Sequence, residues 1–200
     1  MKRIIETIGI TIYTFQELPE AVKELFKLAA AARNNAQAPY SNYHVGCAIV
    51  TRNGKIFSGV NVERCSWTQT SHAEQNAIDS MATSTGPVGL SAIVVVGNPA
   101  NKKISFDSSL PPPDEGTGIK RVQDVCPSCG HCLQIIVENC FKATGEYDPD
   151  VTLWGYHNGE FYCTTIGEAL PMPFIPQYLG VNYAKQSTPK KNLETKDRHF

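Results

Sequence analysis

Two short motifs in the sequence contain side chains that bind metal ions. His72 and Glu74 form the first motif, and Cys129 and Cys132 form the second. Residues three apart on a helix lie on the same face, so both thiolates can reach one ion. One imidazole and two thiolates favour zinc, and three protein ligands leave a fourth tetrahedral position for water. The motifs therefore predict one Zn²⁺ per subunit, coordinated as in a catalytic site.

Glu74 follows the predicted ligand His72 by two positions. In a first helical turn, side chains tilt toward the N-terminus, so both can approach an ion above the helix end. A carboxylate beside the ion, rather than bound to it, can transfer protons. Ser71 and Glu74 also fit a capping box, in which Glu74 would only satisfy the helix start. The residues alone leave both interpretations open.

Cys126 offers a second ligand choice, because it precedes Cys129 by the same spacing that separates Cys129 from Cys132. Pro127 suggests that Cys126 lies ahead of the helix, and the helical face favours the pair Cys129 and Cys132. His131, between these two, is expected at the surface or beside the ligands. The other histidines, at 44, 157 and 199, have no partner at ligand spacing.

The elements around these motifs alternate between strands and helices. Strands are expected over residues 4–14, 44–51, 56–62, 91–97, 151–156 and 160–165, and helices over 17–34, 71–82 and 129–141. Asn-Gly pairs at 53–54 and 158–159 predict two hairpins. The order predicts an α/β domain in which helices flank a mixed sheet, with both metal motifs at helix N-termini.

Charge and hydropathy exclude several classes of protein. The 200 residues include 18 Lys and Arg against 19 Asp and Glu, a net charge of -1. A net charge this close to zero creates no electrostatic field that would attract a negatively charged phosphate backbone. We therefore expect no nucleic-acid partner. No apolar run has the roughly 18 residues of a membrane span, and the N-terminus does not resemble a leader, so we expect a cytoplasmic protein with no membrane partner.

One domain is expected over residues 1–185, followed by a polar C-terminal tail over 186–200. Within the domain, residues 98–125 form a long connection with three consecutive prolines. Connections of this length in compact domains are functional or disordered, so a lid and a surface loop both stay open.

The motifs resemble those of the zinc-dependent cytidine deaminase family, whose signature joins H-x-E with P-C-x-x-C. The resemblance continues in the segments 38–46, 59–63 and 170–179 and covers roughly residues 36 to 180. It implies a three-layer α/β/α domain with a mixed, mainly five-stranded central sheet and an extra N-terminal strand. It also implies hydrolytic deamination of a free pyrimidine nucleoside, cytidine or deoxycytidine, to uridine or deoxyuridine and ammonia in pyrimidine salvage.

The family resemblance implies a role for several side chains. Glu74 would carry protons between the attacking water, pyrimidine N3 and the departing ammonia. Tyr43 would place its ring against the pyrimidine, Asn61 and Glu63 would bind the ribose hydroxyls, and Phe174 would cap the pocket. Ala73 would also contact substrate.

The second motif departs from the family pattern. Ser128 stands where the family usually has proline, and Leu133 where an arginine usually follows the second cysteine. Ser128 is a good helix N-cap residue, while the carbonyl of Pro127 or its neighbour would accept from the amino group being lost. The departures keep open another substrate: a different aminated base, a modified nucleoside or a nucleoside antibiotic. A non-catalytic zinc-binding interaction module is the second alternative, against which the open fourth ligand position argues.

The resemblance also implies an oligomer. Dimeric family members carry an additional C-terminal domain over the site, for which this chain has no room after residue 180. Smaller members are typically tetramers. A homotetramer is therefore expected, with a homodimer as the alternative, and Phe174 would come from a neighbouring subunit.

Overall fold

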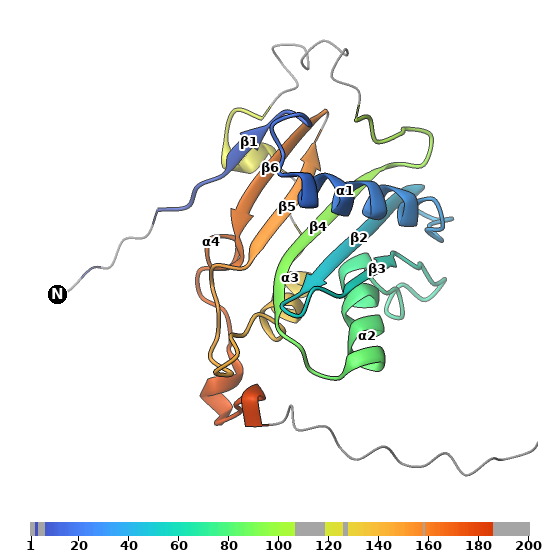
Figure 1. The fold of residues 1–200 in the computed structure, drawn as a ribbon. Coiled ribbons are helices and arrows are strands. Elements are labelled where there is room, and N and C mark those ends of the chain that lie inside the picture. The colour runs from blue at the N-terminus through green and yellow to red at the C-terminus, as the bar shows by residue number, and fades with distance from the viewer. Residues whose placement is uncertain (1–2, 4–6, 107–118, 126–127, 158, 186–200) are drawn as a thin grey trace, which may run out of the picture.

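The computed structural model describes residues 3, 7–106, 119–125, 128–157 and 159–185. These residues form one six-stranded sheet in the order β1-β6-β5-β4-β2-β3 (Figure 1). The strands are β1 (Thr11–Tyr13), β2 (Tyr43–Thr51), β3 (Ile56–Val60), β4 (Leu90–Pro99), β5 (Thr152–His157) and β6 (Glu160–Thr165). The α-helices are α1 (Glu20–Arg33), α2 (Ala73–Thr85), α3 (Gly130–Val137) and α4 (Ile166–Ala169), and short 3-10 turns span Val122–Asp124, Pro176–Leu179 and Tyr183–Lys185.

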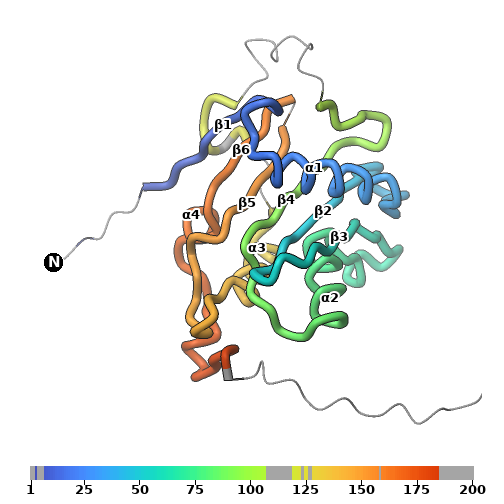
Figure 2. Tube along the Cα trace, in the orientation of Figure 1, coloured from blue at the N-terminus to red at the C-terminus, as the bar shows by residue number. Residues whose placement is uncertain are grey.

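The sheet is mixed, as the sequence predicts. β4 and β5 pair in parallel, with α3 in the connection between them, and the other neighbours pair antiparallel. The N-terminal strand joins this sheet as its edge strand beside β6 (Figure 2). It is shorter than predicted, because only Thr11, Ile12 and Tyr13 pair with β6; residues 4–6 lie outside the described residues.

Helices cover both faces of the sheet (Figure 1). On one face α1 buries Phe26 and Ala29 against Val94 of β4 and Phe161 of β6. On the other face α2 and α3 pack over β2, β4 and β5 around a second apolar core. The predicted three-layer α/β/α fold is thus confirmed, with the N-terminal strand as the sixth strand of the sheet.

Two glycines shape the β2–β3 hairpin and its contact with α2. Gly54, in the β2–β3 turn, has a φ of 79°, which fits the turn that the Asn-Gly pair predicts. A Cβ on Gly59 of β3 would lie 2.3 Å from both the carbonyl oxygen of Ala73 and the backbone nitrogen of Ala77. Because glycine lacks that atom, the start of α2 lies directly against β3.

Across the described part of the chain, no helix combines the length and the apolar character needed to cross a membrane.

Candidate metal centre and active site

The two metal motifs lie at the N-termini of α2 and α3. His72 is the N-cap residue of α2 and Cys129 is that of α3, and neither side chain makes a capping hydrogen bond. Their backbone carbonyls begin the helices, accepting from the N–H of Asn76 at 3.0 Å and of Leu133 at 2.9 Å. The imidazole and the thiol therefore point away from the helices and are available to an ion. The positive ends of both helix dipoles favour negative charge on the thiols.

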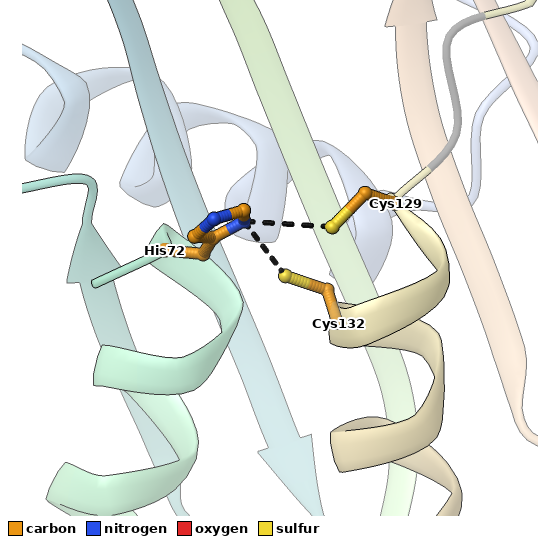
Figure 3. A group of neighbouring side chains, drawn as sticks. All are labelled: His72, Cys129 and Cys132. Carbon is orange, nitrogen blue, oxygen red and sulfur yellow. Dashed lines mark hydrogen bonds between the residues drawn. The ribbon is translucent and has the colours of Figure 1, made fainter. Parts of the chain in front are cut away.

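The three predicted ligand atoms converge on one point (Figure 3). His72 Nδ1 lies 3.5 Å from Cys129 Sγ and 3.2 Å from Cys132 Sγ, and all three atoms lie within 4.8 Å of one another. Zinc bonds of about 2.0 Å to nitrogen and 2.3 Å to sulfur place tetrahedral ligand atoms about 3.5 Å apart. The separations fit a shared Zn²⁺.

The Cys132 thiol shows why a cation belongs here. Burial, followed by the negative charges of Glu74 and Cys129, raises the pKa of Cys132 far above that of a free thiol. Without a cation this buried group is a neutral thiol, whereas metal binding requires and stabilises the thiolate. The donor set therefore fits zinc both in geometry and in charge. Cys126 lies outside the described residues.

Glu74 is buried beside this centre, with 5% of its surface exposed. Its charge raises the pKa of both Cys132 and Cys47, so it lies near the sulfur atoms without belonging to the ligand group. The capping box is absent: the N-cap residue is His72, one residue after Ser71, and Ser71 Oγ instead accepts from Asn76 Nδ2 at 3.0 Å. The carboxylate of Glu74 is therefore free of a capping role.

A cavity of about 490 Å³ opens in front of the centre. Its volume lies within the range of small-molecule sites. It is lined by Tyr43, Val45, Asn61, Glu63, Thr70, His72, Ala73, Glu74, Val95, Gly97, Asn98, Pro99, Lys102, Ser128, Cys129, Tyr156 and His157. The cavity thus brings together seven of the residues that the sequence singles out as catalytic, ligand or substrate-binding groups.

Asn61 reaches the cavity with its amide already held by β2. Its Oδ1 accepts from the backbone N–H of Val45 at 2.8 Å, and its Nδ2 donates to the carbonyl of Tyr43 at 2.9 Å. An amide has two donor hydrogens and two acceptor lone pairs, so one of each stays available to a ligand. The strand therefore fixes the orientation of Asn61 before any ligand binds.

Glu63 is fixed in a similar way by the segment before β2. Its Oε2 accepts from the backbone N–H groups of Tyr40 at 2.8 Å and Ser41 at 3.2 Å. Hydrogen bonds from the Ser41 side chain and these two amides lower the pKa of Glu63 against the opposing effect of burial. Glu63 is thus an oriented, ionised acceptor at the cavity wall.

The remaining predicted substrate residues separate into three groups. Tyr43 and the fully buried Ala73 line the cavity. Phe174 does not line it; the residue is 53% exposed, and Gln134 of α3 holds its backbone by donating to its carbonyl at 2.7 Å and accepting from its N–H at 3.3 Å. Pro127 lies outside the described residues.

The first residues of the long connection over 98–125 form a further wall of the cavity. Asn98, Pro99 and Lys102 line it, and buried Arg33 of α1 holds their carbonyls at 2.8 to 3.0 Å. The length of this connection indicated a functional segment in the sequence, but it did not show which of its residues reach the cavity. His157, treated as ordinary from the sequence, also lines the cavity, since β5 ends there; its spacing to other residues gave no signal.

The two departures from the family pattern occupy different surroundings. Leu133 is buried in the core against α2. Its apolar side chain packs there and, unlike the arginine usual in the family, adds no positive charge beside the thiolates. Ser128 does not cap α3, because Cys129 occupies the N-cap position. The Ser128 hydroxyl is buried at the cavity and has no hydrogen-bond partner among the described residues.

Comparisons with known proteins agree with this site. The family model described as the cytidine and deoxycytidylate deaminase zinc-binding region matches residues 19–144. A cytidine deaminase of Halalkalibacterium halodurans is 31% identical over 153 residues, covering 76% of this chain and 93% of the relative. A blasticidin-S deaminase of Bacillus cereus is 30% identical over 134 residues, covering 67% of this chain and 79% of the relative.

A solved structure gives the same result for the fold. The crystal structure of a cytidine deaminase from Burkholderia pseudomallei aligns with a TM-score of 0.56 and 30% identity, covering 78% of this chain and 100% of that one. The site defines a zinc-binding deaminase, an enzyme of the hydrolase class. The chain belongs to the cytidine and deoxycytidylate deaminase zinc-binding family.

Proposed function

We propose that the protein hydrolytically deaminates a free pyrimidine nucleoside, converting cytidine or deoxycytidine to uridine or deoxyuridine and ammonia in pyrimidine salvage. One observation carries the proposal: a single cavity contains the metal centre, the buried carboxylate of Glu74 and the oriented polar groups of Asn61 and Glu63. The near-zero net charge supports a free nucleoside rather than a polynucleotide.

His72, Cys129 and Cys132 would hold the metal, because their ligand atoms lie within 4.8 Å of one another. When bound, Zn²⁺ supplies Lewis acidity that makes water nucleophilic at neutral pH. Glu74 accepts a proton from the attacking water, donates to N3 of the pyrimidine, and later protonates the departing amino nitrogen. The buried position of Glu74 supports this role, because bulk water does not compete for its proton.

Substrate recognition is assigned to the cavity residues outside the metal ligands and Glu74. Asn61 and Glu63 bind the ribose hydroxyls, Tyr43 lies against the base, and Ala73 contributes at the start of α2. Preformed hydrogen bonds to the backbone hold Asn61 and Glu63 in place, so little side-chain entropy is lost when a nucleoside binds.

A second substrate class has support of its own. Another aminated base, a modified nucleoside or a nucleoside antibiotic would use the same chemistry, and the similarity to a blasticidin-S deaminase favours including such compounds. The unusual Ser128 and the wall at Lys102 lie where substrate selectivity would arise. A non-catalytic zinc module finds no support, because the chain belongs to a family of deaminases.

The functional unit we propose is a cytoplasmic homotetramer, or alternatively a homodimer, in which Phe174 covers the cavity of a neighbouring subunit. Within one chain Phe174 does not reach the cavity. The segment around Phe174 exposes large side chains to solvent: Met172 is 92% exposed, Tyr178 68% and Leu179 71%. Exposed apolar patches of this kind mark surfaces that contact another protein.

The experiment is a substrate panel. The purified zinc-loaded protein is incubated with cytosine, cytidine, deoxycytidine, the monophosphates of the two nucleosides and an aminated nucleoside antibiotic. Absorbance and ammonia release are measured for each compound. Release of ammonia fastest from cytidine or deoxycytidine supports the proposal. Faster release from the antibiotic would support the second substrate class, and no release from any compound would contradict both.

A further inference from the structure

Arg33 is a buried cation that joins a helix to two strands. It is the last residue of α1, and only 4% of its surface is exposed. Its Nε donates to the carbonyl of His44 at 3.0 Å, and its Nη2 donates to three carbonyls at 2.8 to 3.0 Å, those of Asn98, Pro99 and Lys102. Among the described residues no carboxylate lies within ion-pair distance of the guanidinium. Backbone carbonyls therefore take the place of the counter-ion that buried charges normally have.

The packing of α1 on β2 brings the guanidinium to these carbonyls. A Cβ on Gly46 of β2 would lie 2.8 Å from the backbone nitrogen of Arg33, so the helix end lies directly on the strand. The negative end of the helix dipole also favours a cation at the last residue of α1. The fold thus holds Arg33 beneath the sheet end that forms the cavity wall.

Two of the carbonyls that Arg33 binds flank the contact between Tyr43 and Gly97. His44 follows Tyr43 in β2, and Asn98 follows Gly97 in β4, where the two strands pair antiparallel. A Cβ on Gly97 would lie 2.8 Å from a ring carbon of Tyr43, so this ring lies directly against the backbone of β4. Both Tyr43 and Gly97 line the cavity. Arg33 therefore fastens both strands at the point where an aromatic ring faces the ligand.

This end of the sheet needs such a fastening. β4 ends at Pro99, where the chain leaves the sheet for the long connection. Backbone near the end of an element opens more readily than backbone in the middle. A ring that packs on a ligand must keep its place, because small displacements in a binding site cost much of the interaction. The bonds from Arg33 supply this constraint on both strands at once.

We propose that Arg33 is a positioning residue, which fixes the ends of β2 and β4 so that the Tyr43 ring stays on Gly97 where the substrate base binds. The inference rests on the proposed function, in which the base lies against Tyr43. Arg33 is not among the residues that line the cavity, so it acts through the ring and not by contact with the substrate.

The first test is Arg33→Lys. Lysine keeps the charge, but its compact ammonium cannot span carbonyls on two strands as the planar guanidinium does. The dissociation constant of uridine, measured by calorimetry, and KM for cytidine should both rise about 2- to 12-fold, the value of one aromatic contact. We expect kcat and the zinc content to stay unchanged, because the metal ligands and Glu74 lie on α2 and α3.

A second variant moves the ring and leaves the Arg33 bonds in place. In Gly97→Ala the added Cβ displaces the ring of Tyr43, so uridine should bind about 2- to 12-fold more weakly here too. This result does not depend on whether Arg33→Lys folds.

A double-mutant cycle separates positioning of the ring from a general structural role. Tyr43→Ala should weaken uridine binding by itself. If Arg33 acts through the ring, adding Arg33→Lys to Tyr43→Ala should change the dissociation constant by less than about twofold.

Arg52→Lys is the matched control. Arg52 also joins two segments, since it donates to the carbonyl of Phe141 at 2.8 Å and pairs with Asp148, but none of the three lines the cavity. This variant should lower the melting temperature and leave uridine binding unchanged.

Three results would overturn the inference. Unchanged uridine binding in Arg33→Lys or in Gly97→Ala would show that the ring needs no fixed place. An equal loss from Arg33→Lys with and without Tyr43 would show that Arg33 does not act through the ring. An equal loss in Arg52→Lys would show that lower stability alone explains the effect. In each case the wild-type protein still deaminates cytidine and the proposed function stands, whereas no turnover by the wild type would overturn both.

Discussion

The two walls of the cavity differ in how far the protein itself satisfies their polar groups. The metal wall, formed by His72, Glu74, Ser128 and Cys129, adjoins the buried Cys132 thiol, whose pKa is raised. It also contains the Ser128 hydroxyl, which has no hydrogen-bond partner among the described residues.

The recognition wall, formed by Asn61 and Glu63, is already hydrogen-bonded to backbone N–H and carbonyl groups. We infer that the two walls have different roles. An ion and a reacting group would complete the metal wall, whereas hydrogen bonds to the backbone already orient the recognition wall. Variants of the metal wall should therefore abolish chemistry, and variants of the recognition wall should mainly weaken binding.

The largest effect is expected from the metal ligands. His72→Ala, Cys129→Ala and Cys132→Ala should each lose zinc and reduce deamination to background, because two ligands do not retain the ion in a catalytic geometry. Metal analysis by mass spectrometry and an ammonia assay measure both losses. Cys126→Ala is the control and should keep one zinc per chain. Zinc loss from Cys126→Ala together with retention in Cys132→Ala would replace our ligand set.

A smaller but still large effect is expected at Glu74. Glu74→Gln keeps the size of the side chain but cannot transfer protons, so turnover should fall about 10²- to 10⁴-fold while zinc stays bound. Steady-state kinetics and metal analysis on the same preparation measure the two quantities. Turnover close to wild type would remove Glu74 from the proton pathway.

The recognition wall should show a moderate effect limited to ribose. Glu63→Gln removes the charge that accepts hydrogen bonds, so the inhibition constant of uridine should rise about 10- to 100-fold. Uracil, the same base without ribose, is the matched ligand, and its inhibition constant should stay unchanged. An equal rise for uridine and uracil would show that Glu63 supports the cavity generally and does not bind ribose.

The smallest signal is expected from sharing of sites between subunits. Glu74→Gln and Phe174→Ala chains, each inactive alone, should regain a fraction of wild-type activity when mixed oligomers form. In these oligomers some cavities combine Glu74 of one chain with Phe174 of another. Verified mixed oligomers without recovery, or a fully active monomer by light scattering, would contradict the shared cavity.

Local spacing was enough to predict the metal centre and most of the fold. Cys129 and Cys132 lie at helical spacing, and the Asn-Gly turns and apolar runs define the strands from short stretches of sequence. The N-cap role predicted for Ser128 was wrong, because Cys129 holds the N-cap position of α3. The capping box that Ser71 and Glu74 could have formed is absent, since His72 is the N-cap residue of α2.

Tertiary contacts account for what the sequence could not predict. The orientation of Asn61 depends on pairing of its amide with β2, and the wall at Lys102 depends on Arg33, 69 residues away in the chain. Neither contact leaves a periodic pattern in the sequence.

The most direct test of the account is the deamination of cytidine in water enriched in oxygen-18. The wild-type protein should form uridine that carries one heavy oxygen at the carbon that lost the amino group, together with one ammonia per uridine. Mass spectrometry of the nucleoside and an ammonia assay measure both products, with Glu74→Gln as the control that forms neither at a comparable rate. Uridine without the heavy oxygen, or no ammonia from cytidine at all, would contradict hydrolytic deamination at this centre.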